Sequence, residues 1–144
     1  MFNPKIKLND LDSLTIEKYQ EVVEDVSKVN EGNLEDELTS FPAYYSYYYG
    51  LTVASKYRSS RAQARYEEHK SKFLNEARSK SKLSVAQCED LSNANEDLQT
   101  HRKEVDSKEL IYAYMKGICN TLEHKKDMLV QLSANKRQET KLYQ

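Results

Sequence analysis

Residues 41–82 read FPAYYSYYYGLTVASKYRSSRAQARYEEHKSKFLNEARSKSK, and this stretch decides the fold. Its single proline, Pro42, stands near the beginning, where a helix tolerates a residue that lacks an N–H. Apolar and small residues then recur at steps of three and four as far as Ala77. Because this is the spacing of an amphipathic helix, the pattern predicts one long helix over residues 42–82, with Gly50 as the site of any bend.

A second long helix is predicted from Glu96 to about Glu139, where no proline occurs and Gly117 is the only glycine. Its apolar residues fall close to a heptad line, which is typical of coiled-coil-like packing. The line consists of Leu98, Val105, Tyr112, Met115, Cys119, Leu122 and Leu129, with Ile111, Ile118 and Leu132 to one side. The slots of His101, Lys108 and Lys126 face solvent, a subunit boundary or a ligand.

Between the two long stretches, Ser84 and Gln87 fit a capping box. This motif predicts a short helix with the sequence VAQCEDLS. Asn95 is then predicted to cap the second long helix.

The N-terminal part is predicted to contain one short acidic helix, residues 13–31, which ends at Gly32. Residues 33–41 are predicted to form a connector, with Ser40 as the cap of the long helix. Residues 1–12 are expected to be an extended arm or disordered, as chain ends often are.

With 144 residues, Gly 3 and Pro 2, the composition favours a few long helices over many short strands. We therefore predict an all-α fold, an elongated antiparallel helical hairpin of two long helices with a short acidic N-terminal helix. The predicted division is an acidic arm and helix (1–41) and a hairpin domain (42–144). Since the apolar residues are spread thinly, we expect part of the burial to come from partner subunits, as a homo-oligomer.

The net charge is only -1, but the charges are arranged in blocks. Residues 1–40 and 83–109 are acidic, whereas residues 51–82 carry nine basic and three acidic side chains. A nearly neutral chain can therefore present a local electropositive face.

The basic block lies on the first long helix, and several of its members are three, four and seven residues apart, which places them on one face. Such a row suits a phosphate backbone, and Tyr57 and Tyr66 could stack on unpaired bases. The alternative is a solvated face that pairs with the acidic residues at 17–37 or 89–109. The candidate nucleic-acid-binding residues are Lys56, Arg58, Arg61, Arg65, Lys70, Lys72, Arg78, Lys80 and Lys82.

Five tyrosines between residues 44 and 49 surround the helix instead of forming one stripe. Tyrosine is enriched at interfaces because it joins a large apolar body to a polar tip. The tyrosines therefore indicate a subunit interface or a base-stacking surface, and the alternative is a wide core-facing arc with two exposed rings. The candidate oligomer-interface residues are Tyr44, Tyr45, Tyr47, Tyr48, Leu51, Tyr112, Met115, Leu122 and Leu129.

No motif predicts catalysis, a metal or another cofactor. The three glycines are isolated and make no phosphate loop, and the three histidines have no ligand spacing. Cys88 and Cys119 are predicted to be buried small hydrophobes in a reducing compartment. Since no signal-peptide core or membrane-spanning run is found, we expect a cytoplasmic location, in an infected bacterial host if a phage encodes the chain.

Several segments together resemble the UvsY-type phage recombination mediators. They are the tyrosine-rich helix start, the basic long helix, the segments KLSVAQCEDL and NANEDL, and a last helix that ends KKDMLVQLSANKRQE. The final pattern consists of Asp127, Met128, Leu129, Leu132, Ala134, Arg137 and Glu139. The resemblance covers about residues 42–140.

This resemblance implies a ring-like homo-oligomer that binds single-stranded DNA without catalysis. Its partners would be single-strand-binding protein and a RecA-like recombinase, which it would help to load. It also implies DNA-binding roles for Lys70 and Lys72, with Arg58, Arg61, Arg65, Arg78 and Lys80 as their neighbours.

Two further hypotheses remain open at this point. The acidic N-terminal helix either covers the basic face when DNA is absent or contacts a basic partner. The rival to a mediator is a phage structural or assembly adaptor without DNA affinity, and a small enzyme would need a pocket that the sequence does not indicate.

Overall fold

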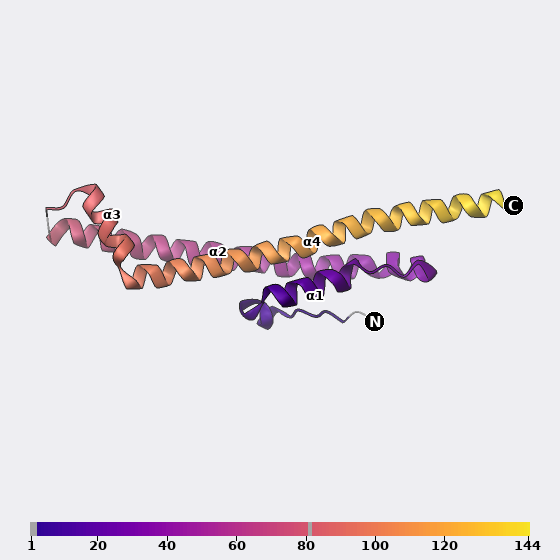
Figure 1. Cartoon of the computed structure of the whole chain (residues 1–144), viewed down its shortest axis with the longest axis horizontal. Helices are drawn as coiled ribbons and strands as arrows, with labels where there is room; N and C mark the ends of the chain where they lie inside the picture. Colours follow the sequence, from indigo (N-terminus) through magenta and orange to yellow (C-terminus); the bar gives the residue numbers. More distant parts are fainter. Residues whose placement is uncertain (1–2, 81) are drawn as a thin grey trace. The chain divides into compact units, whose positions relative to one another are not determined.

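The computed structural model of the chain describes residues 3–80 and 82–144, and over these residues the fold is helical without a strand (Figure 1). The predicted all-α class and the two long helices are thus confirmed. Residues 1–2 of the predicted arm and Ser81 of the predicted helix lie outside the described residues. The elements are η1 (Leu8–Ser13), α1 (Ile16–Ser27), η2 (Glu31–Asn33), α2 (Leu34–Lys80), α3 (Val85–Ala94) and α4 (Glu96–Leu142).

The first long helix, α2, begins at Leu34, so the predicted connector at 33–41 and the cap at Ser40 are wrong. The Ser40 hydroxyl instead donates to the Glu37 carbonyl inside the helix, and Pro42 lies within α2. Leu34 is buried, and three carboxylates in the first turn suit the helix dipole. These contributions offset the proline's cost of roughly 3 kcal/mol. The helix also continues through Gly50.

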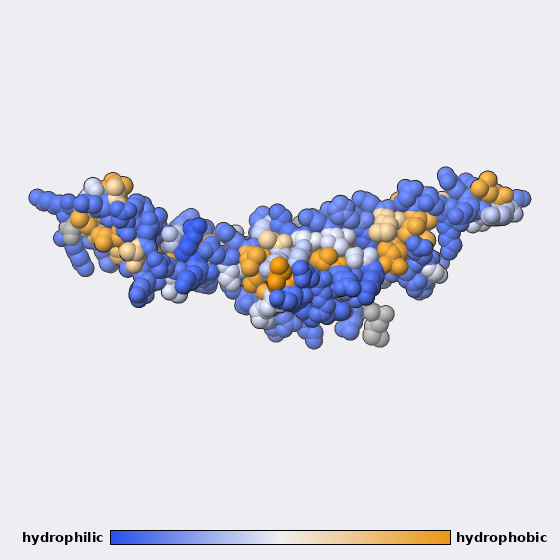
Figure 2. Space-filling view, viewed as in Figure 1, coloured by the Kyte–Doolittle hydropathy of each residue, from blue (hydrophilic) through white to orange (hydrophobic). Residues whose placement is uncertain are grey.

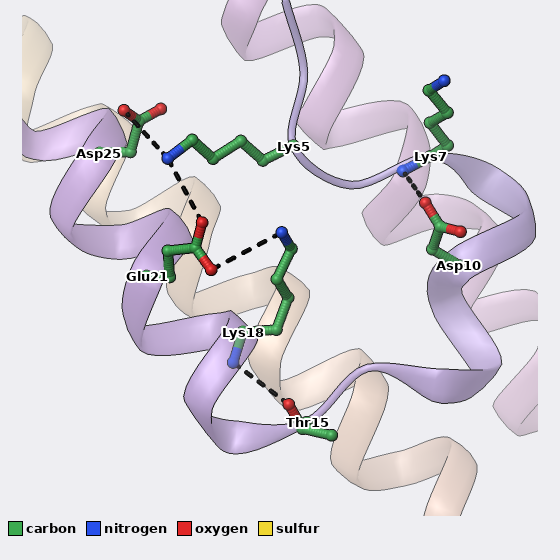
Figure 3. A network of polar contacts seen from close by, with 7 residues as sticks. All are labelled: Lys5, Lys7, Asp10, Thr15, Lys18, Glu21 and Asp25. Atoms are coloured by element: carbon green, nitrogen blue, oxygen red, sulfur yellow. Dashed lines mark hydrogen bonds and ion pairs between the residues drawn. The ribbon is translucent and has the colours of Figure 1, made fainter.

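Helix α1 is shorter at both ends than the predicted 13–31. It begins at Ile16, because the Thr15 side chain accepts a hydrogen bond from the Lys18 N–H at 3.2 Å and caps the helix (Figure 3). It ends at Ser27, and Gly32 lies in η2. On its buried face, Val22 and Val26 lie four residues apart and are 0% and 3% exposed.

The N-terminal segment packs against the protein, so neither expectation for residues 1–12 describes it fully. Ile6 and Leu11 are 1% and 0% exposed, and the Tyr47 hydroxyl donates to the Ile6 carbonyl at 2.7 Å. Lys5 lies between Glu21 and Asp25, at 3.4 and 3.6 Å (Figure 3). Two isolated apolar residues give no periodic signal, although their burial anchors the segment.

The chain forms two compact units, and each long helix contributes to both. Unit 1 comprises Met1–Val53 and Ala113–Gln144, and unit 2 comprises Ala54–Tyr112. The predicted boundary between residues 41 and 42 falls inside α2.

Unit 1 has a continuous apolar core. Here α2 and α4 run antiparallel, because Thr52 bonds to Met115 while Tyr45 bonds to Glu123. Helix α1 joins them through Tyr19, whose ring stacks on that of Tyr114 with centroids 4.9 Å apart. The buried apolar residues are Ile6, Leu11, Val22, Val26, Leu34, Tyr48, Leu51, Met115, Ile118, Cys119, Leu122 and Leu129.

Unit 2 has a thinner core. Its two long segments are also antiparallel, since Arg65 pairs with Glu104 and His69 stacks on His101. The predicted capping box of α3 is confirmed, and Asn95 caps α4 by accepting the Leu98 N–H at 3.0 Å. The buried residues of this unit are Ser55, Ala62, Cys88, Ser92, Leu98, Val105 and Ile111.

The stripe of α4 is buried except for Tyr112 and Leu132, which are half-buried. On α2 the predicted pattern continues to Ala77, but no residue beyond Ala62 is buried. The two cysteines are free and buried as expected. Hydrophilic residues cover most of the face seen in Figure 2, where apolar residues show as separate patches. None of the helices in the described ranges 3–80 and 82–144 has the length and apolar character required to cross a membrane.

Candidate nucleic-acid interface

All nine predicted basic residues lie in unit 2, eight on α2 and Lys82 just after it. Each is exposed or half-buried. The exposure follows from the seam of α2, where the small side chains of Ser55 and Ala62 face inward and the long cations remain outside. The structure then divides these cations by their ion pairs.

Three of the cations are paired with carboxylates. Arg65 Nη2 lies 2.9 Å from Glu104, and Lys70 Nζ lies 3.2 Å from Glu89. Both of these carboxylates belong to the acidic block at 83–109, so for Arg65 and Lys70 the structure agrees with the alternative of a paired face. Lys72 pairs with Glu68 one turn away at 3.1 Å, and its hydrogen bond and charge lower the pKa of the Glu68 carboxyl.

Of the six other cations, Arg58 takes part in an interaction within the chain, and five have no carboxylate partner among the described residues. Over residues 3–80 and 82–144, no carboxylate lies within ion-pair distance of them. They are Lys56, Arg61, Arg78, Lys80 and Lys82. We call this set the unpaired cations, and their charge remains available to an anion.

The two tyrosines that interleave with the cations differ in their surroundings. Tyr57 is 64% exposed, and the Arg61 guanidinium carbon lies 5.9 Å from its ring centroid. Tyr66 is half-buried, and Arg102 of α4 lies 5.6 Å from its centroid. Only Tyr57 therefore presents most of its ring to solvent.

Several acidic residues of the N-terminal part form ion pairs within unit 1. Glu21 lies 3.4 Å from Lys5 and 3.7 Å from Lys18 (Figure 3). Glu37 pairs with Lys125 at 2.9 Å, and these two side chains are only 21% and 14% exposed. These ion pairs connect the acidic segment to other parts of unit 1. The hypothesis that this segment covers the basic face did not include such contacts.

The tyrosine cluster also packs within unit 1. Tyr48 is 1% exposed, and burial raises its pKa to about 12. Burial likewise raises the pKa of Tyr47, which holds the N-terminal segment. The pKa of Tyr45 is raised chiefly by its hydrogen bond to Glu123, and its ring lies between those of Phe41 and Tyr49. Within the chain, Tyr48 is buried and Tyr44, Tyr45 and Tyr47 are half-buried, whereas Tyr49 is 54% exposed. A subunit interface at these tyrosines stays a prediction.

The remaining candidate interface residues are also placed inside the chain. Leu51, Met115, Leu122 and Leu129 are buried in the core of unit 1, and Tyr112 is half-buried in unit 2. A heptad line predicts burial but does not distinguish a partner helix in the same chain from one in another subunit. Within the chain this line packs against α2, and a role in self-association stays a prediction.

Sequence periodicity missed one surface of unit 1. A groove of about 880 Å³ lies between the beginning of α2 and the end of α4, with Leu34, Leu38 and Ala134 in its walls. Lys136, Arg137 and Lys141 add positive charge to the same groove. One wall of the groove is the first part of α2, from Leu34 to Thr39. The sequence did not predict the groove because residues 33–41 were expected to form a connector.

His69 and His101 stack with ring centroids 4.1 Å apart, in a hollow that also contains Glu76 and Asp97. Across the described residues, no group of three or more His, Cys, Asp or Glu side chains is arranged to hold a metal ion. At the heptad position of His101, the side chain therefore stacks on His69 of α2.

Comparisons with protein-family models, with curated proteins and with solved structures found no match to this chain.

Proposed function

We propose that the chain is a non-catalytic protein that binds single-stranded DNA through the unpaired cations of unit 2. The observation that carries this proposal is the division of the basic residues. Three are paired by carboxylates, whereas the five unpaired cations have no carboxylate within ion-pair distance among the described residues. Unpaired, solvated cations release the counterions of a phosphate backbone without first breaking an ion pair.

The division into paired and unpaired cations also reduces the number of candidate DNA-binding residues. Lys70 and Lys72, which the resemblance to UvsY-type mediators selects, are engaged by Glu89 and Glu68. Arg78, Lys80 and Lys82, at the end of α2, have no carboxylate partner among the described residues. We therefore assign the first contact with a strand to the unpaired cations.

Self-association and recombinase loading are the finer part of the proposal, and the resemblance supports them. Few cations per chain give weak binding, and repetition of the same face in an oligomer would convert weak contacts into avidity. In this scheme the oligomer helps to load a RecA-like recombinase onto DNA that is covered by single-strand-binding protein.

The test is fluorescence anisotropy with a labelled single-stranded oligonucleotide and its duplex, at several salt concentrations. We expect preference for the single strand and an affinity that falls with salt, by roughly 0.7 log units per log unit of salt for each neutralised phosphate. No binding at low salt by a sample whose assembly state is known from light scattering would overturn the proposal.

Two triple variants with the same change in charge test the division itself. Arg78→Ala/Lys80→Ala/Lys82→Ala removes unpaired cations, and Arg65→Ala/Lys70→Ala/Lys72→Ala removes the paired ones. We expect the first variant to lose more affinity and more salt dependence than the second. Equal losses would show that pairing does not decide which residues bind.

The groove of unit 1 favours a second candidate, an assembly adaptor that binds a protein segment. This candidate predicts association without salt-dependent DNA affinity. Charge reversal at Arg61 and Arg78, two of the unpaired cations, separates the two candidates, because a DNA-binding protein loses its ligand whereas an adaptor keeps its assembly.

A further inference from the structure

We infer that Tyr57 is a stacking platform for one unpaired base, and that this contact gives the protein its preference for single strands over duplex. The inference rests on the proposed function, since the cations bring the strand to the platform. It assigns a base-binding role to one residue, whereas the cations contact only phosphates.

The first observation is exposure. Tyr57 is 64% exposed, and no other tyrosine or phenylalanine within a described helix is as accessible. In unit 2 the packing of α2 against α4 uses small residues such as Ser55 and Ala62, which leaves the Tyr57 ring outside the core. Its ring is therefore available without any rearrangement of the fold.

The second observation is the charge around the ring. Arg61 lies one turn further along α2, with its guanidinium carbon 5.9 Å from the ring centroid. It is one of the unpaired cations. A base that stacks on the ring would thus have its flanking phosphates next to positive charge, which is how single-strand-binding grooves combine stacking with backbone contacts.

Tyr66 provides a contrast on the same helix. It is half-buried, and Arg102 of α4 lies 5.6 Å from its ring centroid while also lying 3.6 Å from Asp106. Its cation is therefore engaged within the fold, and Tyr66 serves as the matched control.

A stacking platform discriminates by strand type because the bases of a duplex are already stacked on their neighbours. An unpaired base has a free π-face, and one such contact changes affinity by about 5- to 150-fold. Phosphate contacts alone would favour the duplex, which has the higher density of charge.

The experiment compares Tyr57→Ala with the unchanged protein on two single strands of equal length, one of them abasic. On the normal strand we expect Tyr57→Ala to bind about 5- to 150-fold more weakly, with the same slope against salt. On the abasic strand the two proteins should bind equally, because no base is left to stack. Tyr57→Phe should retain the affinity for the normal strand.

Three outcomes would overturn the inference. Equal binding of Tyr57→Ala and the unchanged protein to the normal strand would remove Tyr57 from the site. An equal loss on the normal and abasic strands would show that Tyr57 acts without contacting a base. A matching loss in Tyr66→Ala would show that neither exposure nor position selects the platform.

Failure of the proposed function gives a different result, because the unchanged protein then binds neither strand. Circular dichroism checks that each variant keeps its helices. Tyr57 lies outside the buried core, so its truncation is expected to leave the fold intact.

Discussion

Units 1 and 2 share the same two long helices, yet they are held together differently. In unit 1 the helices enclose large buried side chains such as Tyr48, Met115 and Leu122, and α1 with the N-terminal segment adds a third layer of contacts. In unit 2 the seam contains smaller residues such as Ala62, and the exposed pair of Arg65 with Glu104 bridges the helices.

This difference indicates that apolar packing stabilises unit 1 more than unit 2. Apolar burial contributes roughly 25 cal/mol per Å², so the larger core of unit 1 carries more of the stability. Exposed ion pairs contribute little, about 0–1 kcal/mol each. Folding therefore constrains the charged surface of unit 2 less than the apolar core of unit 1.

The largest expected effect comes from truncating matched leucines in the two cores. Leu122→Ala in unit 1 and Leu98→Ala in unit 2 remove the same atoms from buried sites. Leucine-to-alanine changes in cores cost about 2–5 kcal/mol, and we expect Leu122→Ala near the upper end and Leu98→Ala near the lower end. Urea unfolding followed by circular dichroism measures both, and equal costs would remove the proposed difference between the cores.

An intermediate effect is expected where α1 meets α4. At Gly117, a Cβ atom would meet the Tyr19 hydroxyl and lie 3.0 Å from the ring carbon that carries it. Displacing the ring costs roughly 1–3 kcal/mol, whereas alanine improves the helix by about 1 kcal/mol. Gly117→Ala should therefore lower the free energy of unfolding by about 1 kcal/mol.

The control for this prediction uses Tyr19→Ala. In that background the contact is gone, so Gly117→Ala should raise the free energy of unfolding by about 1 kcal/mol. The same sign in both backgrounds would show that Tyr19 does not dock against Gly117.

The smallest effect on stability is expected for the ion pair of unit 2. Glu104→Gln should change the free energy of unfolding by less than about 1 kcal/mol, because both partners are partly exposed. It frees Arg65, so DNA binding should tighten and the salt slope should steepen by about 0.7.

Glu109→Gln is the matched control, since it removes the same charge from an exposed position of α4, where no cation among the described residues lies within ion-pair distance. It should leave the slope unchanged. An equal gain in both variants would assign the effect to net charge instead of the released arginine.

The elements were predictable wherever the signal was periodic or chemically local. The stripe from Leu98 to Leu129 and the capping box at Ser84 both appear in the structure as expected. The predicted start of α2 was wrong because it treated Pro42 as a residue of the first turn of the helix. The helix begins earlier, at Leu34, whose burial depends on residues distant in sequence. The packing of the N-terminal segment was not predicted for the same reason, since Ile6 and Leu11 are buried only by tertiary contacts.

The candidate site was predictable only as a list of cations. Charge counting placed the basic block on the first long helix correctly. It did not separate Arg65, which faces Glu104, from Arg61, which faces Tyr57. The same holds for the tyrosine cluster. Composition identified the cluster, but not the residues that its members contact, such as Glu123 of α4.

The sequence by itself determined the helices, their buried stripes and the segregation of charge, because these depend on spacing within about two turns. The tertiary structure alone decided which stripe meets which partner and which cations remain unpaired. Those outcomes depend on the register between α2 and α4, which brings Glu104 to Arg65 and Glu123 to Tyr45. Register is set by the packing of the whole seam, so no single motif carries it.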